Sequence, residues 1–171
     1  MDSLEGQRQK NSVQDCKTNK ALKKIIIYTD GACSGNPGKG GWGAILICKT
    51  KDKNGKEVDF TKKISGGDNN TTNNKMELTA VIEALKILKT SCEIDLFTDS
   101  KYVMDGATKW LKQWQDNNWR CANKKPVKNQ ELWQELSLQS QKHIINWHWV
   151  KGHADNVLNN EVDRLARAFT A

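Results

Sequence analysis

A chain of 171 residues is long enough for one domain with a full core, since a domain of about 150 residues buries roughly 68 to 70% of its unfolded surface. The 27 Lys and Arg residues outnumber 20 Asp and Glu residues, and the formal net charge of +7 indicates an anionic partner. The five cysteines contain no CxxC pair, which excludes a recognisable disulfide framework or zinc site and favours a reducing compartment. With no secretory signal and no apolar run of the roughly 18 residues that cross a bilayer, we expect a cytoplasmic monomer that does not enter membranes.

The first half of the chain predicts three strands, a helix and a fourth strand. Residues 1–23 are polar and lack hydrophobic periodicity, so we expect a disordered tail there and a single folded domain at 24–171. Strands at 24–30, 41–49 and 57–66 have short connections, which makes them antiparallel neighbours. Apolar residues at helical spacing predict a helix at 74–90. The strand at 93–98 follows this helical crossover and should lie parallel to the first strand and beside it.

The second half predicts three helices and one strand. Helical segments at 100–116 and 128–141 are separated by a basic stretch that contains tryptophan, and a strand at 143–150 and a helix at 160–169 follow. The complete order is β-β-β-α-β-α-α-β-α. This order predicts an α/β fold with a five-stranded mixed sheet and helices on both of its faces.

Most of the excess positive charge lies between residues 101 and 128, where seven basic side chains face two acidic ones. Tryptophans are interleaved with them, and this combination suits a surface that neutralises phosphates and packs on sugars or bases. The candidate contacts in this segment are Lys101, Trp110, Trp114, Trp119, Lys124 and Lys125. Trp110 and Trp114 are four residues apart on one helix face, so they could equally belong to the core.

Four acidic residues, each within a different short motif, are the candidate reactive groups: Asp30, Glu77, Asp99 and Asp163. Asp30 and Asp99 each follow a short apolar run, as residues do where a buried strand reaches the edge of a sheet. Glu77 falls in the first turn of the helix predicted at 74–90. Carboxylates that converge on one side of a sheet repel one another unless divalent cations neutralise them. The pattern therefore predicts a Mg²⁺ site built from oxygen ligands.

Each of these acids also has a local interpretation. Glu77 could complement its helix N-terminus, and Asp99 could be the N-cap of the next helix. Asp163 could pair with Arg167 one turn later, and Asp30 could form a turn with the glycine that follows it. Each local role is reasonable alone, but together they leave the order of the surrounding motifs unexplained.

Seven motifs carry a resemblance to a known family. They are Thr-Asp-Gly at 29–31, Gly-Asn-Pro-Gly at 35–38, Thr-Asn-Asn-Lys-Met-Glu-Leu at 72–78, Thr-Asp-Ser at 98–100, Lys-Pro-Val-Lys-Asn at 125–129, Trp-Val-Lys-Gly-His at 149–153, and 159–163. In this order the chain resembles the type 1 ribonuclease H family from about residue 24 to residue 168. The resemblance implies that 24–171 is the catalytic domain of an endonuclease. It would hydrolyse the RNA strand of RNA–DNA hybrids, leaving 3′-hydroxyl and 5′-phosphate ends.

The resemblance also implies a role for each reactive group. In a two-metal mechanism, cations roughly 3.5 to 4 Å apart activate the attacking water and stabilise the leaving oxygen. Asp30 resembles the family's bridging carboxylate, and Glu77, Asp99 and Asp163 would complete the coordination of two Mg²⁺ ions, with Mn²⁺ as an alternative. His153 resembles a mobile proton carrier, a role that suits histidine because its unperturbed pKa is about 6.5.

Further residues are expected to contact the substrate: Cys33, Asn36, Thr72, Asn73, Asn74 and Asn129. The turn at 33–36 lets backbone approach the minor groove closely, and asparagine amides can donate to and accept from sugars and base edges. Such contacts can sense the 2′-hydroxyl that distinguishes RNA from DNA. By resemblance, Thr72 and Asn129 would hold a DNA phosphate, and 110–125 would be the family's basic protrusion. Asn73 and Asn74 could instead cap a helix.

The chain departs from the family pattern at two positions that would affect affinity rather than reaction. Lys101 replaces an expected amide side chain, and Asn70 stands where some relatives carry arginine. Two other functions stay open. One is a non-catalytic module that binds hybrids, although such a decay would be expected to cost one of the four acids. The other is a transposase- or integrase-like enzyme of the same fold, although those usually carry appended DNA-binding domains.

Overall fold

The computed structural model of the protein describes residues 22–151 and 156–170. The fold is built around one five-stranded sheet. Its strands are β1 (Lys23–Cys33), β2 (Gly38–Lys51), β3 (Glu57–Thr71), β4 (Cys92–Thr98) and β5 (Ile144–Trp149), in the order β3-β2-β1-β4-β5. The first three are antiparallel neighbours, whereas β4 is parallel to β1 and β5 is parallel to β4. The predicted mixed sheet is confirmed. Of the tail predicted at 1–23, residues 1–21 lie outside the described residues, and Lys23 already belongs to β1.

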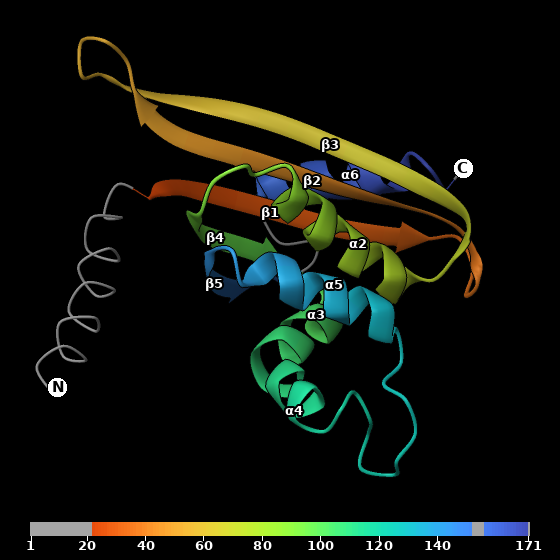
Figure 1. Cartoon of the computed structure of the whole chain (residues 1–171). Coiled ribbons are helices and arrows are strands. Elements are labelled where there is room, and N and C mark those ends of the chain that lie inside the picture. The colour runs from red at the N-terminus through yellow and green to blue at the C-terminus, as the bar shows by residue number, and fades with distance from the viewer. Residues whose placement is uncertain (1–21, 152–155, 171) are drawn as a thin grey trace, which may run out of the picture.

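Helices cover both faces of the sheet, as predicted (Figure 1). They are α2 (Asn73–Lys86), α3 (Lys101–Asp105), the π-helical turn η2 (Gly106–Trp110), α4 (Leu111–Asp116), α5 (Gln130–Ser140) and α6 (Val157–Arg167). The α2 and α5 helices pack together on one face, and α6 packs on β1 and β2 from the other. None of the helices in the described ranges is long and apolar enough to cross a membrane.

The alternation of side chains along β1 supplies two hydrophobic cores. Ile27 faces α2 and α5 in the larger core, which also contains the fully buried Trp133. The next residue, Tyr28, points to the opposite face, where it packs with Ile45 of β2 and Val162 of α6. Because successive side chains of a strand point to opposite faces, β1 is held between both cores. The central strand is therefore the most firmly fixed support for a functional side chain.

Several element boundaries differ from the sequence predictions. The helix predicted at 74–90 begins at Asn73 and ends at Lys86, where the Leu88 amide donates to the Leu85 carbonyl in a final tight turn. The helix predicted at 160–169 begins at Val157, because the Asn156 side chain accepts a hydrogen bond from the Asn159 amide, 3.0 Å away, and so caps it.

The segment predicted as one helix at 100–116 is divided into α3, η2 and α4. Gly106 begins the π-helical turn and packs directly on the Trp133 indole, which fills the space that a Cβ atom would need. Residues 101–116 are thus helical, as predicted, but they do not form one regular α-helix, and Ser100 is the N-cap.

Candidate active site

Two neighbouring parallel strands place Asp30 and Asp99 side by side. Thr29 of β1 is in register with Thr98 of β4, so the aspartates that follow them lie at the same level of the sheet. Asp99 comes directly after the last residue of β4, as predicted. Asp30 was expected at the end of β1, but that strand continues to Cys33 because Asp30 and the residues after it keep pairing with β2. Asp30 is therefore held inside the ladder and is only 3% exposed.

Gly31 allows α2 to approach β1 closely enough to bring Glu77 to Asp30. A Cβ atom on Gly31 would lie 2.6 Å from the Met76 carbonyl carbon, closer than packed atoms come. The backbone of α2 therefore rests directly on β1, and Glu77 is buried with 3% exposure. Since the helix begins at Asn73, Glu77 lies in its second turn rather than in the first. The alternative that Glu77 complements the helix N-terminus is wrong, because the first turn contains no acidic residue.

On the other face, α6 contributes Asp163. A Cβ atom on Gly43 would lie 2.7 Å from the Leu165 Cβ, so this helix also packs against sheet backbone. The Arg167 Nε lies 3.0 Å from an Asp163 carboxylate oxygen, which confirms the local pairing considered from the sequence. That pair does not remove Asp163 from the site, since both side chains line the same cavity as Asp30.

The four acids meet around one cavity of about 410 Å³. Its lining consists of polar and charged side chains together with Gly31: Asp30, Asn73, Asn74, Glu77, Asp99, Ser100, Lys101, Tyr102, Asn159, Asn160, Asp163 and Arg167. Carboxylate oxygens of Asp30, Glu77 and Asp99 all lie within 4.8 Å of one another, a spacing that lets a single cation contact all three. Asp163 lines the cavity outside this trio.

Burial makes this cluster of acids electrostatically unfavourable without a cation. Burial, followed by the charge of Glu77, raises the pKa of Asp30 far above the ordinary range of a carboxyl group. Burial likewise raises the pKa of Glu77 to about 8. The pKa of Asp99 is also raised, chiefly by burial and then by the charge of Asp163, although the Asn159 side chain lowers it through a hydrogen bond. Without a cation, Asp30 and Glu77 therefore retain their protons to a higher pH than ordinary carboxyl groups do, and a bound cation would displace these protons.

Two buried oxygen atoms in the cavity support a cation site independently of charge. Glu77 Oε2 and Asn159 Oδ1 are both inaccessible and have no hydrogen-bond partner among residues 22–151 and 156–170. Unpaired buried acceptors cost free energy, which coordination to a metal would recover. Carboxylate and amide oxygens are the ligands of Mg²⁺, Ca²⁺ and Mn²⁺. The residues therefore fit an oxygen-ligated divalent cation.

Asn159 is the site residue that the sequence reasoning missed. It precedes Asp163 by one helical turn, so the two side chains lie on the same face of α6. It is only 2% exposed although it is polar, and it stands next to a second asparagine, Asn160, that is exposed. The feature of the sequence that could have identified Asn159 is its spacing of four residues from Asp163, which was already a candidate metal ligand.

The structure excludes two capping roles that the sequence left open as alternatives. Ser100 caps α3, because its Oγ accepts from the Val103 amide at 3.2 Å, so Asp99 is free of that role. Thr72 caps α2 in the same way, accepting from the Lys75 amide at 3.2 Å. Asn73 and Asn74, the caps considered from the sequence, instead line the cavity.

In the turn after β1, Asn36 is exposed to solvent, whereas the Cys33 side chain makes a hydrogen bond within the protein. The Cys33 thiol donates to the Thr71 carbonyl at 3.3 Å, which ties the end of β1 to the end of β3. The Ser34 amide and hydroxyl both donate to the Lys39 carbonyl, at 2.8 and 2.9 Å, and so close the turn. Within this turn Asn36 is exposed, with a cis peptide bond to the following proline.

Asn129 lies beside a second, larger cavity of about 730 Å³, which it lines with Thr71 and Lys75. Its amide donates to the Tyr102 hydroxyl at 3.0 Å, and the Trp133 indole donates to the same oxygen at 2.9 Å. Tyr102 lines the cavity that holds the four acids, so its hydrogen bond with Asn129 connects the linings of the two cavities. Thr72, which was expected to bind a phosphate together with Asn129, is the N-cap of α2 and follows Thr71 of the cavity lining.

The tryptophans of the basic segment form a series of tilted and edge-on ring contacts that leads into the core. Trp114 packs on Trp133 with ring centroids 5.2 Å apart, and Trp119 also packs against the larger core. Trp110 lies over Trp114 at 6.0 Å and is 39% exposed. Trp114 therefore packs against the core, which was the alternative considered from the sequence, and Trp110 is the more exposed of the two rings.

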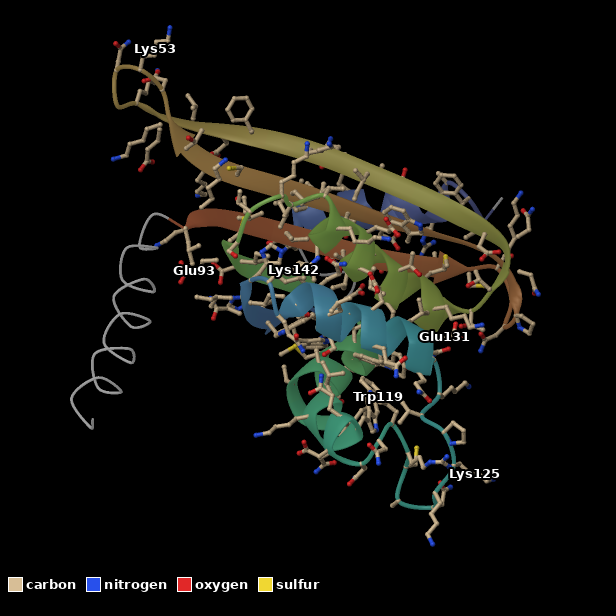
Figure 2. The ribbon with its side chains drawn as sticks, in the orientation of Figure 1. Lys53, Glu93, Trp119, Lys125, Glu131 and Lys142 are labelled. Carbon is tan, nitrogen blue, oxygen red and sulfur yellow. The ribbon has the colours of Figure 1, made fainter. Side chains whose placement is uncertain are left out.

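The lysines of the same segment point outward. Lys124 and Lys125 are exposed in a turn in which the Cys121 amide donates to the Lys125 carbonyl at 2.8 Å. Figure 2 shows Lys125 pointing away from the body, with Trp119 on the inner side of the loop. Lys101 stands at the catalytic cavity, with its Nζ 5.1 Å from the centroid of the Trp149 ring. His153 lies outside the described residues.

Comparisons with known proteins agree with this geometry. The family profile for RNase H matches residues 22–170. A ribonuclease H from Ehrlichia canis is 56% identical over 147 residues, which are 86% of this chain and 94% of that protein. The crystal structure of LC9-RNase H1, a type 1 RNase H with the type 2 active-site motif, has a TM-score of 0.74 and 29% identity, covering 87% of this chain and 72% of that one.

A second solved structure is LC11-RNase H1 in complex with RNA/DNA hybrid. It superposes with a TM-score of 0.59 over 85% of this chain and 96% of that one, and at 21% identity it shows likeness of fold. With a profile match over residues 22–170, a relative of more than half identity and a cluster of carboxylates on neighbouring strands and helices, the chain belongs to the type 1 ribonuclease H family.

Proposed function

We propose that this protein is an endonuclease that hydrolyses the RNA strand of RNA–DNA hybrids, leaving 3′-hydroxyl and 5′-phosphate ends. The observation that carries the proposal is the trio of carboxylates, two of them almost fully buried, whose oxygens lie within 4.8 Å of one another. Deprotonated carboxylates this close together and this buried repel one another unless a cation neutralises them, and family membership supplies the substrate class. The LC11 relative, solved with RNA/DNA hybrid, shares the fold.

We assign Asp30, Glu77, Asp99 and Asp163 as ligands of two Mg²⁺ ions. Such ions, when bound, supply Lewis-acid stabilisation of the attacking water and of the leaving oxygen. Asp30, on the central strand β1, has a carboxylate oxygen within 4.8 Å of both Glu77 and Asp99. Asn159 lines the same cavity as Asp99, and Arg167 holds Asp163 by its ion pair. We propose His153 as the proton carrier for the leaving oxygen.

Selection of the hybrid is proposed to depend on amides around the cavity. Asn73 and Asn74 line it, and exposed Asn36 stands on the neighbouring turn, so their side chains can address sugars and base edges. A 2′-hydroxyl offers both a donor and an acceptor to such groups, whereas DNA lacks it. We further assign Lys101 to a phosphate near the reacting bond, and Thr72 with Asn129 to a phosphate of the DNA strand. We place the enzyme in the cytoplasm as a monomer.

The decisive experiment compares matched RNA–DNA, RNA–RNA and DNA–DNA duplexes of one sequence, each with Mg²⁺, with Mn²⁺ and with chelator. We expect cutting of the RNA strand of the hybrid only, and only with metal. Equal cutting of RNA–RNA would identify a general ribonuclease. Binding of the hybrid without any cutting would identify the non-catalytic module. Joining of DNA ends would identify a strand-transfer enzyme.

The exposed turn at 121–125, which carries Lys124 and Lys125 and is called the basic loop below, gives a separate prediction about affinity. We expect the Lys124→Ala/Lys125→Ala variant to weaken hybrid binding and to lower the slope of log K against log salt by about 2, since each phosphate contact releases about one counterion. Turnover at saturating substrate should be unchanged, because these exposed side chains lie outside the catalytic cavity.

The matched control removes the same charge elsewhere, in Lys51→Ala/Lys53→Ala at the tip of the β2–β3 hairpin, where both lysines are exposed. Figure 2 shows Lys53 at this tip, far from Lys125. If both double variants lower the slope equally, the effect reflects net charge, and the basic loop does not contact the substrate.

A further inference from the structure

The helix α6 carries two polar residues of the catalytic cavity, Asn159 and Asp163. It packs on β1 and β2 through the smaller core, in which Val162 lies with Tyr28 and Ile45. Apolar packing is not directional, so it fixes which face of the helix is buried better than it fixes where the helix lies along the sheet. Contacts at the two ends of α6 therefore decide where its oxygen atoms stand.

The side chain of Asn156 makes two hydrogen bonds at the start of α6. Its Oδ1 accepts from the Asn159 amide at 3.0 Å and so caps the helix. Its Nδ2 donates to the Tyr28 hydroxyl, 3.3 Å away, and so ties the same turn to β1. Capping needs only the oxygen, which a serine, threonine or aspartate would also supply. The bond to Tyr28 is thus an additional contact, which we call the Tyr28 tether.

The Tyr28 ring is held in a row of stacked rings that crosses three strands. The Phe97 ring of β4 lies 4.6 Å from the Tyr28 ring, with an angle of 8° between their planes. The His148 ring of β5 stacks on Phe97 at 4.7 Å, and its Nε2 lies 2.9 Å from Asp95 Oδ1. Because side chains two residues apart in a strand share a face, Tyr28 and Asp30 lie on the same face of β1. The tether therefore joins α6 to the part of β1 that positions Asp30.

The other end of α6 is anchored separately. Phe169, two residues after the helix, rests on Gly41 and Gly67, which are paired across β2 and β3. A Cβ atom on Gly41 would lie 2.7 Å from the Phe169 Cβ, and one on Gly67 would lie 2.6 Å from its Cδ1. Loss of the Tyr28 tether would therefore release the N-terminal end of α6, which carries Asn159, while the C-terminal end keeps its place.

Charge within the cavity acts against the tether. Burial, and then the charge of Asp163, raise the pKa of Asp99, so these two carboxylates repel each other when both are deprotonated. Asn159 Oδ1, buried and without a partner in the described ranges, belongs to the same cavity. A bond that resists outward movement of α6 keeps Asn159 and Asp163 in place before a cation binds. Contacts that orient ligands in this way strengthen metal binding.

We propose that Tyr28 and Asn156 are positioning residues that raise the affinity of the four acids for cations by holding α6 against β1. Both side chains stand outside the described lining of the catalytic cavity, so they act through the helix. This inference rests on the proposed function, since it concerns the same cations. It gives the tether a role in cation binding that a helix cap alone does not have.

Two neutral substitutions remove the tether without removing the cap. Tyr28→Phe deletes only the hydroxyl and keeps the stacked ring, and Asn156→Ser keeps an oxygen that can cap α6. We expect each to raise the Kd of the metal-free chain for Mn²⁺ about fivefold, or about 1 kcal/mol, the net contribution of one hydrogen bond. Electron paramagnetic resonance of free Mn²⁺ measures this Kd. The double variant should match the single variants, since all three lack the same bond.

Cleavage of hybrid gives a second measurement. The Mg²⁺ concentration for half-maximal cleavage should rise in Tyr28→Phe by about the same factor as the Kd, while kcat at saturating Mg²⁺ stays within about twofold of wild type. Leu111→Ala is the matched control for a loss of stability alone, because Leu111 is half-buried on α4 and packs against the larger core. It should lower the melting temperature and leave both cation measurements unchanged.

Four results would overturn the proposal. They are unchanged values of both cation measurements in Tyr28→Phe; equal changes in Leu111→Ala, which would attribute the effect to global stability; additive effects in the double variant; and a lower kcat at saturating Mg²⁺ with unchanged cation affinity. A wild-type chain that binds Mn²⁺ but leaves hybrid intact would refute the proposed function instead, because the Mn²⁺ titration tests the tether without any cleavage.

Discussion

Asp30→Asn is expected to abolish cleavage while raising the melting temperature of the metal-free protein. The variant keeps the size of the side chain and the acceptor for the Gly31 amide, 2.9 Å away, but removes an ionisable group that can bind a cation. Loss of a metal ligand should cost several kcal/mol of transition-state stabilisation, or about 10³-fold in kcat. Relief of the burial penalty on Asp30 should raise the melting temperature by about 2 to 4 °C per kcal/mol gained.

Opposite effects on activity and stability distinguish a metal ligand from a structural acid. Cleavage kinetics, hybrid binding and thermal melts with chelator measure the three quantities, and hybrid binding should persist in the variant. Glu57→Gln, which neutralises an exposed acid at the start of β3, is the control and should change neither activity nor stability. An Asp30→Asn protein that melts lower than wild type and still cleaves would remove Asp30 from the metal site.

The metal-free protein is expected to lose stability as the pH rises from about 5 to about 8. The folded-state pKa of Glu77 is raised to about 8, whereas an unfolded glutamate titrates at about 4.3. Between these values the folded chain binds a proton that the unfolded chain has released, so unfolding becomes more favourable as pH increases. Asp30, whose pKa is raised in the same direction, adds to the loss.

Divalent cation should reverse this pH dependence, because it binds the deprotonated carboxylates of the folded chain. At a Mg²⁺ concentration 100 times its Kd, the expected stabilisation is about 2.7 kcal/mol. Urea unfolding across this pH range, with chelator and with Mg²⁺, measures both effects. Glu77→Gln isolates the contribution of this one group, and its metal-free profile should be flatter than that of wild type. Parallel profiles for the two proteins would contradict the raised pKa.

The strand order and the four acids could be predicted from sequence because both depend on local signals. Asp99 follows an alternating apolar run, and this pattern specifies a strand and its end. The end of α2 could not be predicted in this way. Ile87 and Leu88 continue the apolar spacing of the helix, but they pack against the core after the helix has ended. Hydrophobic periodicity reports burial, and a turn can bury the same side chains.

Other parts of the site depend on contacts between residues distant in the chain. The Tyr102 hydroxyl accepts hydrogen bonds from Asn129 and Trp133, and nothing in the sequence around Tyr102 indicates these partners. The exposed ring of Trp110 and the half-buried ring of Trp114 could not be told apart, because α3, η2 and α4 turn these residues toward different surroundings. Sequence reasoning identified the chemistry of the site but not its supporting hydrogen bonds.

The contact of α2 with Gly31 has a consequence for how this enzyme can diverge. The separation of Asp30 from Glu77 is set where the backbone of α2 at Met76 and Glu77 meets the backbone of β1 at Gly31. Leu78, Val81 and Ile94 can therefore exchange for other hydrophobic residues of similar volume while the two ligands keep their spacing. Core residues can therefore change during evolution, or be redesigned, provided that position 31 remains glycine. The absence of a side chain there keeps the distance between Asp30 and Glu77 on which metal binding depends.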